Sequence, residues 1–250
     1  MCDSGLTPAA ERWGGWPALP AREPGAPAGD WTDLTWPFSP TVPRLAAFPA
    51  PRVERIMTMP EQPLNVSELH TVVHIGTHVD SPRHFVIDGP AFEDIPLDRL
   101  LGRGVVWRIE KPPLGVIVPA DLEQMRPRLE PGDILAIDTG AQARVGTDSY
   151  DQHPSLSVEA THWLLERQLK LLAVDVPTPE LALSARPAAF DYPVHRLLLG
   201  SGVLIAEQVT NLGALAGSQD EFMFCPISIV GSDGAPARVL ARRVSSQTSV

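Results

Sequence analysis

From about residue 31 onward, the sequence alternates short apolar segments with short amphipathic ones, and this alternation restricts the fold to a mixed α/β class. The apolar segments are rich in Val, Ile and Leu and are bounded by Gly and Pro, which is typical of β-strands. We expect strands at 52–58, 66–74, 104–109, 133–138, 171–175, 203–207, 222–230 and 237–242. We expect helices at 96–101, 119–126, 157–169 and 193–199, and a hairpin turn at the Gly-Ser-Asp-Gly run 231–234. No internal repeat or strong boundary interrupts the pattern, so it predicts one α/β domain over 31–250.

Residues 1–30 differ from the rest because Pro, Gly and Ala dominate them, a composition typical of an irregular arm. Four of the six tryptophans nevertheless lie in this arm or just after it, at Trp13, Trp16, Trp31 and Trp36. Large aromatic side chains favour burial. The arm is therefore either free or docked, with a subunit interface as one docking place, and we expect a homodimer or homotetramer.

The charge and the cysteines limit the partners and the setting of the chain. A formal net charge of −10 disfavours nucleic acid and anionic membranes, both of which select basic surfaces. Cys2 and Cys225 form no C-x-x-C pair, and no stretch resembles a signal peptide, so a reduced cytoplasmic setting is expected. No apolar run approaches the roughly 20 residues that a membrane span requires.

The candidate functional site is a histidine cluster. Three of the seven histidines fall in the eleven residues His74-Ile-Gly-Thr-His-Val-Asp-Ser-Pro-Arg-His84, together with Asp80. Imidazole nitrogens and carboxylate oxygens are ligands for Zn²⁺ and Mn²⁺, and burying several such groups is costly unless they are paired. The cluster therefore indicates a divalent-metal site.

The local sequence predicts a strand that bends inside this cluster. The β-branched residues at 71–73 disfavour a helix, Gly76 weakens one and Pro82 ends one. A straight strand would hold the Cα atoms of His74 and His78 roughly 13 Å apart, at the limit for two ligands of one ion. We therefore expect the chain to bend near Gly76.

Additional ligands must come from elsewhere in the chain. His195 is expected on a short helix, and Glu207 ends an apolar strand candidate, where an uncompensated carboxylate would be out of place. These two residues are the best candidates to complete the site.

The pattern H-x-G-T-H-x-D-x-P-x-H resembles the hallmark of the cyclase family of metal-dependent hydrolases, which includes bacterial kynurenine formamidase and isatin hydrolase. All its fixed positions are met between His74 and His84. The family's later His and Glu match His195 and Glu207, which are twelve residues apart and are followed by an Asn-Leu pair at 211–212. Segments 131–135, 153–157 and 231–238 also have counterparts in the family, so the resemblance covers roughly residues 31–243.

The resemblance implies a swivelling β/β/α fold and a role for each residue of the site. His74, His78 and Asp80 would hold a first divalent ion, Zn or Mn. Asp80 and Glu207 would bridge to a second ion held by His195, although one ion suffices in some relatives. The ion would supply hydroxide from a bound water near neutral pH, with His84 as the proton donor and acceptor.

Three further residues are predicted to contact the substrate, namely Phe85, His153 and Phe48. The formamidase branch has a tryptophan in a P-x-W-P-G-D stretch, which is absent from residues 43–49 here, where Phe48 is the nearest aromatic counterpart. This difference argues against kynurenine formamidase activity specifically.

The remaining polar residues are not assigned to the chemistry of the site. Thr77 either orients a ligand or serves the bend. The residues expected to be structural are His70, His162, Asp133, Asp138 and Asp175.

The combined prediction is a hydrolase of an amide, lactam or lactone in a small cyclic or aromatic substrate. One alternative is a polyketide-type cyclase or dehydratase that uses the same metal site. The other is a non-catalytic metal-binding protein, which the intact set of ligands and acid/base histidine makes the weakest of the three.

Overall fold

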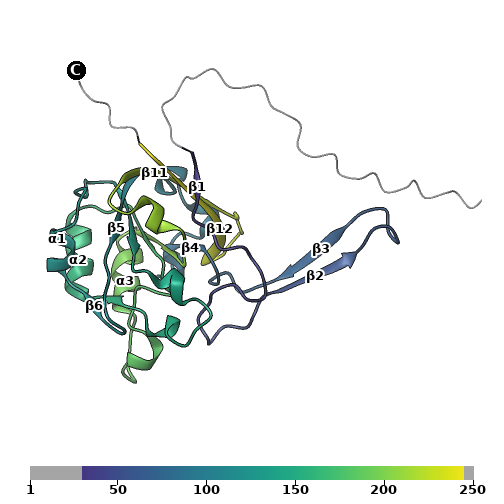
Figure 1. The fold of residues 1–250 in the computed structure, drawn as a ribbon, viewed down its shortest axis with the longest axis horizontal. Helices are drawn as coiled ribbons and strands as arrows, with labels where there is room; N and C mark the ends of the chain where they lie inside the picture. The colour runs from purple at the N-terminus through teal and green to yellow at the C-terminus, as the bar shows by residue number, and fades with distance from the viewer. Residues whose placement is uncertain (1–29, 245–250) are drawn as a thin grey trace, which may run out of the picture.

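The computed structural model of the chain describes residues 30–244 (Figure 1). The predicted N-terminal arm therefore lies outside the described residues, apart from its last residue.

The core of the molecule is one eight-stranded sheet. In spatial order its strands are β1 (Thr32–Asp33), β12 (Gly234–Arg243), β11 (Gln219–Pro226), β5 (Leu101–Arg108), β7 (Ile134–Asp138), β9 (Leu171–Val174), β10 (Leu204–Glu207) and β4 (His78–Asp80). Strands β5, β7, β9 and β10 run parallel to one another, while β4, β11 and β12 pair antiparallel. Because β4 pairs with β10 on one side and with β12 on the other, it closes the sheet.

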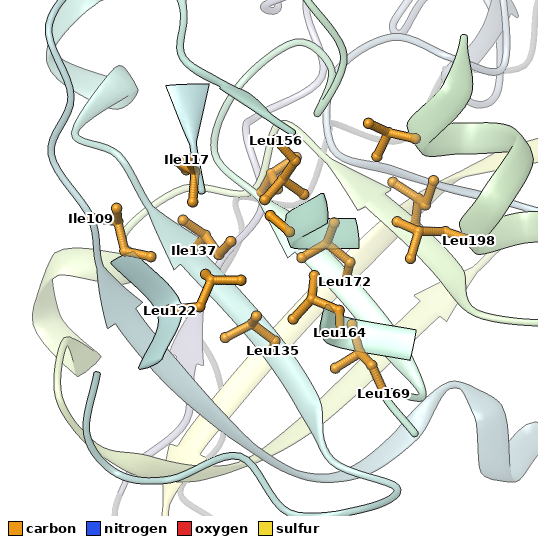
Figure 2. Packing of buried hydrophobic residues seen from close by; sticks show 14 of the residues in the cluster. Ile109, Ile117, Leu122, Leu135, Ile137, Leu156, Leu164, Leu169, Leu172 and Leu198 are labelled. Carbon is orange, nitrogen blue, oxygen red and sulfur yellow. The ribbon is translucent and has the colours of Figure 1, made fainter. Parts of the chain in front are cut away.

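Alternating side chains of the central strands supply two hydrophobic cores. On β7, Leu135 and Ile137 belong to one core, while Ile134 and Ala136 belong to the other. This is the period of two that a strand buried on both faces requires. Figure 2 shows the first core, to which Leu164 and Leu198 contribute together with Leu135 and Ile137 of β7 and Leu172 of β9.

Within the described range, three α-helices accompany the sheet: α1 (Pro119–Glu123), α2 (Val158–Glu166) and α3 (Pro193–Gly200). The segment carrying α2 joins parallel strands β7 and β9, and α3 joins β9 to β10. Ser157 caps α2, since its side chain accepts a hydrogen bond from the backbone N–H of Ala160 at 3.0 Å. Short 3₁₀ turns occur at Pro82–His84, Phe92–Asp94, Leu97–Arg99, Ala141–Arg144, Tyr150–Gln152, Leu183–Ala185 and Leu212–Leu215.

Two small sheets complete the fold. Strands β6 (Val116–Ile117) and β8 (Ser155–Leu156) pair in parallel. Strands β2 (Arg52–Met57) and β3 (Val66–His70) form an antiparallel hairpin that projects from the body (Figure 1). Its Ile56 side chain is 56% exposed.

The structure corrects several predicted boundaries. The strand expected at 66–74 stops at His70, and the strand expected at 222–230 runs over Gln219–Pro226, because residues 227–233 form the loop to β12. The helix expected at 96–101 is only the turn Leu97–Arg99, since β5 begins at Leu101. The helix expected at 157–169 ends at Glu166, and Gln168 lies in the left-handed region with a φ of 54°. Among residues 30–244, no helix is long and apolar enough to cross a membrane.

Candidate metal centre

Strand β4 brings two predicted ligands together with a third. Val79 belongs to the second core, so its neighbours His78 and Asp80 project from the opposite face of the strand. Glu207, at the end of β10, is the register partner of His78. Side chains of directly paired residues share one face of a sheet, so His78, Asp80 and Glu207 meet there.

His74 joins them because the chain bends just before β4. Gly76 has a φ of +62°, in the left-handed region that favours glycine, which confirms the predicted bend. The ring of His74 lies against Gly234, where an added Cβ would come within 2.6 Å of the imidazole. His74 Nδ1 is 2.7 Å from Asp80 Oδ1.

His195 comes from the first turns of α3, as predicted. Its Nε2 lies 3.2 Å from Glu207 Oε1 and 3.7 Å from Asp80 Oδ2. The structure thus brings all five predicted ligands into one buried cluster, consisting of His74, His78, Asp80, His195 and Glu207.

In each of the three predicted ligand histidines, one ring nitrogen contacts an acceptor that is not one of the five predicted ligands. His74 Nε2 is 2.9 Å from Asp233 Oδ2, His78 Nδ1 is 2.7 Å from the carbonyl of Gly76, and His195 Nδ1 is 3.0 Å from Glu180 Oε1. These acceptors favour a proton on the outer nitrogen. The other nitrogen of each ring faces the carboxylates with its lone pair available.

The two carboxylates divide the cluster into two halves. Asp80 Oδ1 faces His74 and His78, while Asp80 Oδ2 faces His195. Glu207 Oε2 lies 3.4 Å from His78 Nε2, and its Oε1 faces His195. This division fits either one ion or two ions bridged by both carboxylates.

The chemistry and burial of these five side chains fit a divalent cation. His78 Nε2 and Asp80 Oδ2 are fully buried and have no hydrogen-bond partner among residues 30–244. Leaving such atoms unpaired is costly, and a cation coordinated by nitrogen and carboxylate oxygen would satisfy both. His74, His78 and Asp80 each offer a ligand atom within 4.8 Å of the others.

Without a cation, protons balance the carboxylates. Burial alone would lower the pKa of His74 and His78, but the negative charge of Asp80, with Asp233 beside His74 and Glu207 beside His78, raises these pKa values to about 9 and about 10. Burial likewise opposes ionisation of Asp80, yet the surrounding histidines hold the pKa of that carboxyl well below its usual range. The cluster is therefore an acidic pocket that requires positive charge.

His84 sits at the edge of this cluster, on the turn Pro82–His84. Its side chain is 26% exposed and stacks on His74 with a centroid distance of 3.9 Å. Burial lowers the pKa of His84 below 6.5, which favours the neutral imidazole at pH 7. It also lies within 4.8 Å of ligand atoms of Asp80 and His195, so the geometry permits a ligand role as well as proton transfer.

The predicted substrate contacts lie at different places. The Phe85 ring is 4.8 Å from the His195 ring and 5.4 Å from that of Tyr192, so it forms an aromatic wall beside the cluster. His153 is buried and lines a cavity of about 260 Å³ with Leu45, and its Nε2 has no hydrogen-bond partner in the residues that the structure describes. Phe48 follows Leu45 in a turn, and no aromatic contact among the described residues links it to the cluster.

Among the remaining polar residues, Thr77 and three aspartates make structural contacts. Thr77 donates to the carbonyl of Gln208 at 2.8 Å and accepts from the backbone of Trp36, so it fixes the bend. Asp133, Asp138 and Asp175 accept backbone N–H groups at 3.0 Å from Glu130, Gly140 and Thr139. His70 and His162 are exposed.

Sequence reasoning missed two carboxylates that contact the histidines. Asp233 lies in the loop before β12 and reaches both His74 and His84. Its only sequence signal is its place in the run 231–234, which predicts a turn. Glu180 carried no recognised signal.

The closed sheet places three imidazoles and two carboxylates in one buried cluster that could hold a divalent cation. Comparison with known families narrows the class of protein, because the family described as "Putative cyclase" matches residues 32–181, more than half of the chain. The chain belongs to this cyclase family.

Individual relatives agree with this assignment. Kynurenine formamidase of Salinibacter ruber is 29% identical over 192 residues, which cover 73% of this chain and 82% of the relative. Kynurenine formamidase of Bordetella petrii is 27% identical over 186 residues, covering 74% and 84%. Isatin hydrolase A of Labrenzia aggregata shares the fold with a TM-score of 0.78 at 23% identity, covering 86% of this chain and 93% of that one. The predicted cyclase-like α/β fold is thereby confirmed.

Proposed function

We propose that this chain is a metal-dependent hydrolase of a carbonyl–nitrogen or carbonyl–oxygen bond in a small amide, lactam or lactone. The observation that carries the proposal is the inward-facing set of three imidazole nitrogens and two carboxylates. Two of these buried atoms, His78 Nε2 and Asp80 Oδ2, find no hydrogen-bond partner in the described part of the chain. The relatives and neighbours named kynurenine formamidase and isatin hydrolase support an amide as the bond that is cleaved.

His74, His78 and Asp80 would hold one ion, and His195 would hold a second with Asp80 and Glu207 shared between them. The ion would be Zn²⁺ or Mn²⁺, both of which accept this mixed nitrogen and oxygen set. When bound, such an ion polarises a carbonyl and lowers the pKa of a water molecule toward neutrality.

The chain's own residues supply the remaining chemistry. His84 is the only one of the cluster's imidazoles with a side chain as much as 26% exposed, so it can exchange a proton with substrate and solvent. We assign it as the group that takes a proton from the attacking water and returns it to the leaving atom. Phe85 and Tyr192 offer flat apolar surfaces that can orient a cyclic or aromatic substrate and exclude water.

Reaction in ¹⁸O-labelled water tests the reaction type. The purified enzyme, loaded with Zn²⁺ or Mn²⁺, should be assayed on N-formyl arylamines, isatins and lactones. Hydrolysis places one labelled oxygen in an acid product, whereas a dehydrative cyclase releases water and leaves its product unlabelled. The His78→Ala variant serves as the control for any turnover that does not depend on the site.

The second candidate, a cyclase or dehydratase, is favoured by one structural relative. A protein described as a potential metal-dependent hydrolase with cyclase activity shares 25% identity and a TM-score of 0.71. Unlabelled product from a polyketide-like substrate, with no turnover on the panel of amides and lactones, would establish this function instead.

A further inference from the structure

Glu180 is a buried carboxylate that is none of the five predicted ligands. Its side chain is 1% exposed, and it lies in the segment after β9 that is buried throughout residues 175–180. A buried carboxylate is costly unless it is paired and hydrogen-bonded. Among the described residues, the hydrogen-bond partners of its side chain both belong to His195.

The contacts of Glu180 fix His195 at two points. The same oxygen, Oε1, accepts the backbone N–H of His195 at 2.8 Å and lies 3.0 Å from its Nδ1. His195 is the third residue of α3, where a helix N–H has no partner within the helix. Tyr192, at the N-cap, provides no side-chain cap, so Glu180 caps the helix from outside.

The contact between Glu180 and His195 Nδ1 determines the tautomer of the His195 ring, and so the state of Nε2. With the proton on Nδ1 and donated to Glu180, Nε2 has its lone pair directed at Glu207 Oε1 and Asp80 Oδ2. A carboxylate behind a ligand histidine fixes its tautomer and raises its basicity. The backbone contact adds a constraint on the main chain that carries the ring.

We infer that Glu180 is the positioning residue that aims His195 Nε2 at the Asp80–Glu207 pair and thereby sets the divalent-metal affinity of that half of the cluster. The inference rests on the proposed function, because it requires the cluster to hold an ion. It concerns affinity rather than turnover, so it can be measured without knowledge of the substrate.

A double-mutant cycle on Zn²⁺ affinity tests the inference. Dissociation constants are measured by competition with a chromophoric chelator for the wild type, Glu180→Ala, His195→Ala and the double variant. We expect Glu180→Ala to weaken Zn²⁺ binding by about 10–100-fold, the usual effect of losing an outer partner. In the His195→Ala background the same change should alter affinity by less than about twofold, because the residue through which it acts is gone.

Two further variants separate positioning from folding. Glu180→Gln keeps an oxygen that can accept both N–H groups, so its metal-free melting temperature should stay near that of the wild type and its Zn²⁺ affinity should lie between wild type and Glu180→Ala. Glu166→Ala is the matched control, since the Glu166 side chain is 76% exposed at the end of α2. It should leave both quantities unchanged.

Three results would overturn the inference. Equal losses of affinity in the wild-type and His195→Ala backgrounds would show that Glu180 supports the fold and not His195. An unchanged Zn²⁺ affinity in both Glu180 variants would show that it does not act on the metal. A wild type that binds no divalent ion would remove the proposed function and this inference together, whereas the first two results leave the proposed function intact.

Discussion

The ligand histidines use their two ring nitrogens for different tasks. In His74, His78 and His195 the outer nitrogen is tied to Asp233, Gly76 and Glu180, and the inner one faces Asp80 or Glu207. His84 has no such division, since its nearest carboxylate contact is Asp233 at 3.5 Å. This difference is the structural basis for separating ligands from a proton carrier.

His84→Ala should keep its metal while losing activity. If His84 transfers protons without holding the ion, metal stoichiometry stays near wild type and kcat falls by roughly 10²–10⁴-fold. His78→Ala should lose metal and activity together, because a ligand is removed. Elemental analysis of both variants, beside their kcat values, makes the comparison.

Either of two outcomes would reject this division of roles. Metal loss in His84→Ala equal to that in His78→Ala would make His84 a ligand. Near-normal turnover with metal retained would show that proton transfer does not need it.

The site residues that the sequence predicts are those that lie close together along the chain in a recognisable motif. His74, His78, Asp80 and His84 lie in one short run, so their residue types and spacing carried the signal. Glu180 and Asp233 lie 15 and 38 residues from His195, and single acidic residues occur throughout the chain. Their roles depend on which nitrogen each histidine ring presents, and that orientation is not encoded in any spacing.

At the scale of elements, strand β12 makes room for the site. Gly234 pairs with Asp80, and a Cβ at this position would meet the His74 ring at 2.6 and 3.0 Å. The closure of the sheet and the placement of His74 thus depend on the same glycine.

Gly234→Ala should therefore reduce metal affinity by displacing the His74 ring. We expect a loss of about tenfold or more, since disturbing the groups that orient a ligand histidine usually costs about 10–100-fold in metal affinity. Gly200→Ala is the control, because nothing lies within 4 Å of its added Cβ. The Zn²⁺ affinities of both variants are measured by competition with a chelator. Equal affinities in Gly234→Ala and Gly200→Ala would show that the His74 ring adapts to the added methyl group.

The hairpin of β2 and β3 projects from the body, and we propose it as the contact for self-association. Isolated two-stranded hairpins are marginally stable, and this one exposes Val53, Ile56 and Leu69. We expect wild-type protein to sediment above the 27.1 kDa of one chain. Ile56→Glu should shift it toward the monomer, because a charge at an apolar contact is costly.

The control is Ile87→Glu, at a side chain that is 99% exposed outside the hairpin. A wild-type monomer at micromolar concentration would contradict the expectation of an oligomer. An oligomer unaffected by Ile56→Glu would place the contact elsewhere.

The sequence predicted the existence of most elements better than their ends. Buried strands such as β7 and β9 were found because continuous apolar runs bounded by Gly and Pro are distinctive. The helix expected at 96–101 and the strand expected at 66–74 were wrong in extent, because the pairing of β5 and the turn at Gly76 override local preference.

For the whole molecule, the decisive feature is the closure of the sheet by β4. Three residues, His78–Asp80, pair with both β10 and β12. Such a short segment has no strand signal of its own, so the closure could not be predicted from the sequence. It explains why the site lies where three distant parts of the chain meet.

Metal binding should consequently stabilise the entire fold. At a free ion concentration of about 100 times Kd, binding adds about 2.7 kcal/mol to the free energy of unfolding. For a chain of this size, this corresponds to a melting temperature roughly 5–10 °C higher. Differential scanning calorimetry of metal-depleted and reloaded protein should show this shift in the wild type and not in His78→Ala, and a shift of equal size in the variant would place the stabilising ion elsewhere.

The most direct test of the central claim is metal content measured together with reconstitution of activity. Elemental analysis of the purified chain should find one to two divalent ions. Chelation should abolish turnover on the panel of formamides, isatins and lactones, and Zn²⁺ or Mn²⁺ should restore it. A chain that carries no metal, and gains no activity from either ion, would contradict the account.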